Sequence, residues 1–261
     1  MKQSHIPRKR FGQHFLCDQN IVQRIVAAIN PGRGQHLVEI GPGQGAITLP
    51  VLKKCHHLEV IEFDRDLVPE LEDRTAGIGQ LVIHSADVLD FDFASIQQAG
   101  QPLRVFGNLP YNISTPLIFH LLSYADIISD MVFMLQKEVA ERLAAPCASA
   151  AYGRLSVMVQ YHCQVDLLFD VPPTAFHPPP QVQSSIVRMT PHKTYPLVAK
   201  DYDLFANIVR QAFGQRRKTL RNSLKGIVDD AAWQQISVQS DLRAEKLSVE
   251  DFVEIANVLA G

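Results

Sequence analysis

The sequence offers little that could build a metal or disulfide centre. Its 261 residues include four cysteines, which lie far apart and form no Cys-x-x-Cys pair: Cys17, Cys55, Cys147 and Cys163. No group of histidines and cysteines has the spacing of zinc ligands either. We therefore expect no bound metal, and free thiols of the kind that persist in a reducing cytoplasm.

Long hydrophobic runs are also missing. The sequence has no stretch of about 18 apolar residues, which a membrane-spanning helix would require. The basic N-terminus is not followed by the apolar core of a signal peptide. These absences predict a cytoplasmic protein with no membrane partner. The hydrophobic content of 46% is enough for one large core, or for one core and a small appended domain.

Acidic residues are absent from two segments that are rich in Lys and Arg. Residues 1–13 contain four basic residues and residues 208–225 contain six, whereas the other 15 basic residues face 27 acidic ones. Two basic segments on an acidic body predict an anionic polymer as partner. If the second segment is helical, Arg217, Lys218 and Arg221 share one face. The residues that we expect to contact phosphate are Arg8, Lys9, Arg10, Arg216, Arg217, Lys218 and Arg221.

Apolar runs of strand length alternate with helical periodicity before residue 192. This alternation is typical of an α/β protein with a Rossmann-like, doubly wound sheet and helices on both faces. From residue 201 onward the pattern is only helical. We therefore expect an α/β domain over residues 1–195, a small α-helical domain over residues 196–261, and a monomer. The expected strands are at residues 36–40, 58–64, 81–84, 103–106, 130–135, 167–171 and 185–189.

A glycine turn follows the first long strand. Gly41, Gly43 and Gly45 have the spacing G-x-G-x-G, not the G-x-G-x-x-G of dinucleotide sites, and no Gly-Lys-Ser/Thr is present. The turn can still bring a ligand close to the backbone. Glu62 ends the next strand about 20 residues later, where a carboxylate can bind both hydroxyls of a ribose. Asp87, after the third strand, could accept a hydrogen bond from an adenine amine.

Residues 106–112 carry the strongest chemical signal. They continue a buried strand into a turn, in which Pro110 holds Leu109 extended. The Asn108 side chain and the Leu109 carbonyl offer two neutral acceptors, and Tyr111 offers a flat face. Together these groups could bind a planar base that carries an amine.

A proline-rich loop provides a second aromatic candidate. Residues 172–180 contain five prolines, which make a stiff loop that can hold Phe176 outward. With Tyr111 on the opposite face, Phe176 could complete a sandwich around a base that has left its stack.

These motifs together resemble those of the bacterial small-subunit ribosomal RNA adenine dimethyltransferases. The residues Asn108 to Tyr111 match the motif of amine-directed methyltransferases. The resemblance implies S-adenosylmethionine as cofactor and the 16S RNA of an immature (pre-30S) small ribosomal subunit as partner. It also implies two adjacent dimethyladenosines in the 3′-terminal hairpin of that RNA as product, and a role in small-subunit biogenesis. The segments that carry it span the chain: 8–16, 38–45, 60–66, 107–114, 176–184 and 215–224.

The resemblance also implies roles for single residues. Position 14 is often Asn in members of the family, so His14 departs from the pattern. The catalytic residues would be Asn108, Leu109, Pro110, Tyr111 and Phe176. The cofactor-binding residues would be His14, Leu16, Gly41, Gly43, Glu62, Asp87 and Asn108.

Two other functions fit the same residues. One is a related methyltransferase of the antibiotic-resistance type, which acts on large-subunit RNA; the basic run 216–221 and the proline-rich loop favour the small-subunit enzyme. The other is a ribosome-assembly binding factor whose catalysis is incidental. Binding and chemistry would use different segments, so both roles stay open at this point.

Overall fold

The computed structural model describes residues 14–261 except Pro196 and Arg216. The chain forms two compact units. The first contains the described residues up to Ala140 together with Asp166–Pro191, and the second contains Glu141–Val165 and His192–Gly261. The boundary that we predict at residues 195/196 lies close to one of the crossings between the units. The structure also groups residues 141–165 with the C-terminal unit. The sequence has no composition shift or linker at either end of this segment, so the predicted boundaries did not include it.

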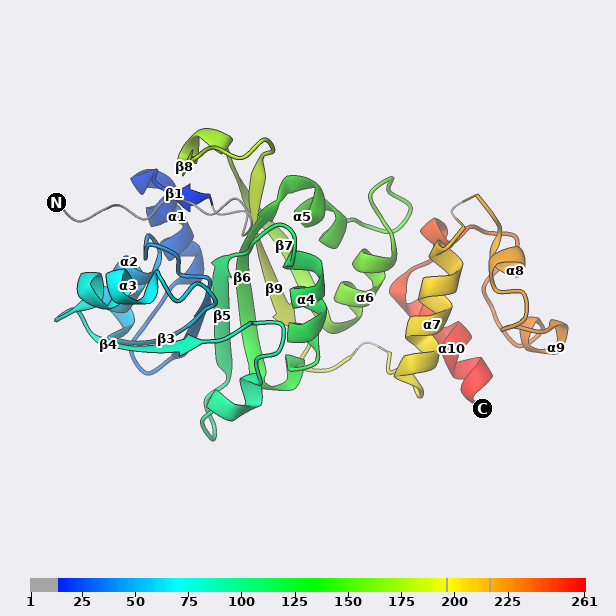
Figure 1. The fold of residues 1–261 in the computed structure, drawn as a ribbon. Helices are drawn as coiled ribbons and strands as arrows, with labels where there is room; N and C mark the ends of the chain where they lie inside the picture. The colour runs from blue at the N-terminus through cyan, green and yellow to red at the C-terminus, as the bar shows by residue number, and fades with distance from the viewer. Residues whose placement is uncertain (1–13, 196, 216) are drawn as a thin grey trace. The chain divides into compact units, whose positions relative to one another are not determined.

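The first unit is built on a sheet that has seven strands in the described part of the chain, in the order β4-β3-β2-β5-β6-β9-β7 (Figure 1). Strands β2 to β6 pair in parallel, and β9 is antiparallel to β6. The predicted α/β sheet is confirmed. The strands are β2 (His36–Ile40), β3 (His57–Glu62), β4 (Gln80–Ser85), β5 (Leu103–Asn108), β6 (Ile128–Gln136), β7 (Cys163–Val171) and β9 (Ser184–Pro191).

Helices cover both faces of this sheet. Apolar side chains of the first three helices pack with one face of the strands in a single hydrophobic cluster, which includes Val26, Leu52, Leu71 and Phe106. Figure 1 shows α4 on the opposite side of the sheet. The helices are α1 (Gln19–Ile29), α2 (Thr48–Cys55), α3 (Val68–Thr75), α4 (Ser114–Leu122) and α5 (Lys137–Leu143), of which α5 continues into the second unit.

Two short strands form a second sheet that is separate from the seven-stranded one. Strand β1 (Phe15–Leu16) pairs antiparallel with β8 (Phe176–His177), so that Leu16 lies opposite Phe176 (Figure 1). Asp18 then caps α1 by accepting from the backbone N–H groups of Asn20 and Ile21. The pairing ties the segment before α1 to the proline-rich loop.

The second unit is helical. The ring of Phe213 lies 6.1 Å from that of Tyr152 and 5.7 Å from that of Phe252 in its core. The predicted helix across Arg217, Lys218 and Arg221 is wrong, because α8 begins only at Leu220, after Thr219 at its N-cap. Within the described residues, no helix has the length and apolar character needed to cross a membrane. The helices are α6 (Arg154–His162), α7 (Tyr202–Phe213), α8 (Leu220–Ser223), α9 (Asp230–Trp233) and α10 (Val249–Ala260).

One guanidinium joins three elements of the first unit. The Nε and Nη2 atoms of Arg104, on β5, donate to both carboxylate oxygens of Asp130, on β6, at 2.6 and 2.9 Å. Nη2 also donates to the carbonyl of Ile29 at the end of α1, at 2.7 Å. Both charged side chains are less than one-fifth exposed, at 18% and 16%. The hydrogen bond to Asp130 raises the pKa of Arg104, so the guanidinium stays charged and holds α1 against the sheet.

We expect Arg104→Ala to lower the free energy of unfolding by about 2 kcal/mol, because the substitution removes the cation that pairs with the Asp130 carboxylate and the donor to the Ile29 carbonyl. Arg221→Ala is the matched control, since the ion pair of Arg221 with Asp230 is exposed (56% and 82%) and should contribute below about 0.5 kcal/mol. Urea unfolding measures both. Equal losses in the two variants would contradict this role of Arg104.

Candidate active site

The glycine turn, residues 41–45, follows directly after the last residue of β2. Gly41 and Gly43 adopt positive φ angles of 64° and 54°, a backbone region that side chains other than glycine rarely occupy. The Gly41 N–H donates to the carbonyl of Ile61 on β3 at 2.9 Å. A Cβ on Gly43 would lie 3.4 Å from the Phe15 ring. The turn is therefore held tightly between β3 and β1.

Glu62 ends β3 and is bound to this turn. Its Oε2 accepts from the Gly43 N–H at 3.2 Å, and its Oε1 accepts from the Asp64 N–H at 2.7 Å. The side chain is buried, and burial raises the pKa of Glu62 against the opposing effect of these two hydrogen bonds. The predicted ribose carboxylate thus also fixes the shape of the glycine turn.

Glu39 is a buried acid that our reading of the sequence missed. It lies on β2, is 2% exposed, and lines the same cavity. Its Oε2 has no hydrogen-bond partner among the described residues. Burial, with a further contribution from the nearby Glu62 carboxylate, raises the pKa of Glu39 to about 8. The sequence does contain a signal for this residue, because Glu39 lies between the apolar residues Val38 and Ile40 of the predicted strand.

Asn108 lies at the end of β5, next to the glycine turn. The two strands come close because Gly107 pairs with Ile40; a Cβ on Gly107 would lie 2.3 Å from the Ile40 carbonyl oxygen. The Asn108 Nδ2 donates a long hydrogen bond of 3.4 Å to the His14 carbonyl. Its Oδ1 accepts no hydrogen bond from the described residues. Within the described residues, Asn108 therefore presents an acceptor beside the turn that has no donor.

Tyr111 is fixed at two points. Its hydroxyl lies 2.8 Å from Ser184 Oγ, and its ring is stacked with that of His14 at a centroid distance of 6.1 Å and an interplanar angle of 30°. Burial raises the pKa of Tyr111, so the phenol stays protonated. His14 is itself held by a contact of 2.8 Å between its Nδ1 and the Pro178 carbonyl.

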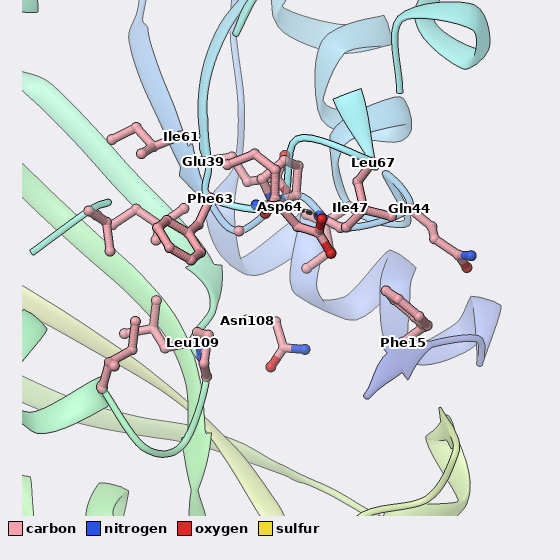
Figure 2. A pocket seen from close by; sticks show the side chains of 18 of the residues that line it. Phe15, Glu39, Gln44, Ile47, Ile61, Phe63, Asp64, Leu67, Asn108 and Leu109 are labelled. Carbon is pink, nitrogen blue, oxygen red and sulfur yellow. Dashed lines mark hydrogen bonds between the residues drawn. The ribbon is translucent and has the colours of Figure 1, made fainter. Parts of the chain in front are cut away.

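These groups line one cavity of about 260 Å³. The walls come from β1, the glycine turn and the carboxyl ends of β2, β3 and β5, and Figure 2 shows the Asn108 side chain below Phe63 and Asp64. Phe63 is 57% exposed, although it is large and apolar, which makes it a second residue that we missed. The predicted residues that the structure brings together here are His14, Leu16, Gly41, Gly43, Glu62, Asp87, Asn108, Leu109, Pro110 and Tyr111.

Phe176 does not lie opposite Tyr111, where it would have to be to stack on the other face of a base. Its side chain is 4% exposed and belongs to the hydrophobic cluster under the sheet, with Ala175 and Val171. Pairing of β8 with β1 turns it inward against Leu16, and it does not line the cavity. Phe176 is therefore buried instead of held outward by the proline-rich loop, and the expected stacking role has no support in this geometry.

The described residues that we expect to contact phosphate, Arg217, Lys218 and Arg221, do not line this cavity. Arg217 and Lys218 are exposed in the turn before α8, and Arg221 on α8 donates to Asp230 at 2.5 Å. Arg8, Lys9, Arg10 and Arg216 lie outside the described residues.

Comparison with known proteins decides the family. The model of the ribosomal RNA adenine dimethylase family matches residues 4–261. The chain belongs to the ribosomal RNA adenine dimethylase family. The predicted family membership and the methyltransferase class are confirmed.

Relatives with closely similar sequences match nearly the whole of this chain. The chain is 57% identical to ribosomal RNA small subunit methyltransferase A of Chromohalobacter salexigens, over 98% of this chain and 93% of the relative. It is 54% identical to the protein of that name from Pseudomonas putida, over 98% and 96%. A dimethyladenosine transferase from Plasmodium falciparum has a TM-score of 0.78 at 26% identity, over 93% and 96%. A 23S ribosomal RNA methyltransferase shares the fold, with a TM-score of 0.73 at 20% identity over 95% and 100%.

The raised pKa of Glu39 predicts a pH dependence of stability in this dimethylase. Between pH 4.5 and about 8 the folded state binds a proton at Glu39 that the unfolded state releases, so the free energy of unfolding falls as pH rises. Glu39→Gln should remove this loss and be more stable than the wild type at pH 8 by roughly 1–3 kcal/mol, since one pKa unit corresponds to about 1.4 kcal/mol.

Urea unfolding at pH 5.5 and pH 8 measures this difference. Glu72→Gln, which changes an exposed glutamate on α3, serves as the control and should leave the pH dependence as it is in the wild type. A Glu39→Gln protein that loses stability with pH as steeply as the wild type would refute the assignment.

Proposed function

We propose that this protein transfers methyl groups from S-adenosylmethionine to the N6 amines of two adjacent adenosines in the 3′-terminal hairpin of small-subunit ribosomal RNA. One observation carries the proposal: the side chain of Asn108 and the ring of Tyr111 share a cavity with the glycine turn and Glu62. A cofactor site and an amine site at the same sheet edge are what a direct transfer between two bound molecules requires.

The glycine side of the cavity fits the cofactor. S-adenosylmethionine supplies the methyl group on a sulfonium and carries a second positive charge on its ammonium. The unpartnered Oε2 of Glu39 would bind that ammonium beside Gly41, and Glu62 would accept from the ribose hydroxyls. Phe63 offers an exposed ring for the adenine, and Asp87 an acceptor for its amine. The remaining residues assigned to the cofactor are His14, Leu16 and Gly43.

The other side of the cavity fits an adenine amine. The nitrogen of this amine is a weak nucleophile, because its lone pair is delocalised into the ring. The Asn108 Oδ1 and the Leu109 carbonyl would accept hydrogen bonds from its two N–H groups and favour a pyramidal nitrogen. Pro110 holds these acceptors in place, and the ring of Tyr111 supports one face of the base. The residues thus act by orientation and by electrostatic stabilisation of the positive charge that develops on the amine.

The sequence relationship supports the choice of RNA. Relatives that are 54–57% identical over nearly the full chain are named small-subunit methyltransferases. We therefore propose an immature (pre-30S) small ribosomal subunit as the physiological partner. The fold shared with a 23S RNA methyltransferase says nothing about this protein's substrate, because the identity is 20%.

Asn108→Ala tests the amine site. We expect the single-turnover rate of methyl transfer to fall by about 100-fold or more, as when one preorganised polar group is removed from a transition state. Binding to the small ribosomal subunit should change little, because Asn108 makes only a small part of that interface. The measurement is dimethyladenosine formed on unmethylated small ribosomal subunits, with both substrates saturating.

Asn20→Ala is a matched control on the exposed face of α1 and should retain the wild-type rate. A wild-type rate in the Asn108→Ala protein would show that the amine is held elsewhere. Absence of dimethyladenosine with the wild-type enzyme would reject the proposed function itself.

The exposed basic turn before α8 predicts a salt effect. Changing Arg217 and Lys218 to Ala should flatten the slope of log affinity for the small subunit against log salt by roughly 1.5 units, at 0.7–0.9 per phosphate contact. Lys53 and Lys54, exposed at the end of α2, provide a control pair of equal charge. If both double variants shift the slope equally, the basic turn has no special role in RNA binding.

A further inference from the structure

The proposed amine site depends on the orientation of one ring, that of Tyr111. The ring projects from a turn, two residues beyond Leu109, and could rotate about its side-chain bonds. Its hydroxyl is anchored instead to Ser184, at 2.8 Å, across 73 positions of the sequence. Tyr111 is only partly buried, and its other ring contact described above, the stacking with His14, is long at 6.1 Å.

Ser184 is itself held firmly. It is 1% exposed and is the first residue of β9, where it lies opposite Gln136 at the end of β6. The preceding residue is held as well, because the Gln183 carbonyl accepts from the Lys137 N–H at 2.9 Å. The Ser184 hydroxyl is buried, and its strand β9 is paired with β6. It can therefore hold the Tyr111 hydroxyl in one position.

The same strand β6 holds the amine acceptors. Asn108 pairs with Met134, and the Leu109 N–H donates to the Met134 carbonyl at 3.2 Å. Met134 and Gln136 are two residues apart on β6. The acceptors, on β5 and the turn after it, and the anchor of the ring, on β9, are therefore both paired with the same short segment of β6.

We propose that Ser184 is a positioning residue for methyl transfer, which sets the plane of Tyr111 relative to the acceptors of the amine. This inference rests on the proposed function. The hydroxyl pair fixes the angle at which the base lies on Tyr111, and through it the direction of the amine lone pair. Ser184 does not touch the base, so its effect passes entirely through the Tyr111 hydroxyl.

A double-mutant cycle tests this coupling. Ser184→Ala and Tyr111→Phe each remove one side of the hydroxyl pair and keep the aromatic ring. We expect each variant to lower the single-turnover rate by about 3- to 10-fold, the range for one hydrogen bond between neutral groups. The double variant should be no slower than the single ones, because the same interaction is lost in all three. Affinity for the small ribosomal subunit should stay constant.

Ser185→Ala is the control for a general effect at the start of β9. Ser185 is also buried, but its Oγ donates to Asp170 at 2.6 Å and not to Tyr111. It should keep the wild-type rate. Full activity of Ser184→Ala, or rate losses that multiply in the double variant, would overturn the positioning role. Inactive wild-type and Ser185→Ala proteins would instead reject the proposed function.

Discussion

The close approach of β2 and β5 at their carboxyl ends is the constraint on which the site depends. Gly107 pairs with Ile40, and a side chain on Gly107 would collide with the Ile40 carbonyl at 2.3 Å. Only a glycine keeps the two strands in register at this point. Their continuations are Gly41 and Asn108, so the same contact brings the glycine turn next to the proposed acceptor of the amine. A shift of either strand would separate the two halves of the cavity.

This geometry concentrates acids on one side of the cavity. Glu39, Glu62 and Asp64 are all buried there, with exposed fractions of 2%, 7% and 5%. Burial, with repulsion between neighbouring carboxylates, raises the pKa values of Glu39 and Glu62. A cationic ligand would stabilise the ionised forms that burial disfavours. Stability of the empty protein and affinity for a positively charged cofactor are therefore opposed, and both would change with pH.

The sheet could be predicted from the sequence because its strands are regular apolar runs. Most of the candidate site could be predicted because its polar residues come directly after those runs. Parallel strands expose their last residues at one edge, so the sequence alone predicts that Glu62, Asp87 and Asn108 lie together. Phe176 failed because pairing between β1 and β8, two segments 160 positions apart, decides which way it faces. Arg217, Lys218 and Arg221 do not share a helical face, because α8 begins only after its N-cap Thr219. Long-range pairing and local capping are not encoded in periodicity.

The identity of residue 108 follows from its surroundings. An aspartate there would add another carboxylate beside the buried acids of the cavity, and its pKa would rise for the reasons that act on Glu39. Once protonated, such a side chain would present a hydroxyl donor where the proposed chemistry needs an acceptor. The amide of Asn108 has no charge to lose and keeps the same acceptor at every pH at which the protein folds. Its Nδ2 also donates to the His14 carbonyl, a contact that a carboxylate could not make. A neutral acceptor is thus the choice that an acidic cavity imposes.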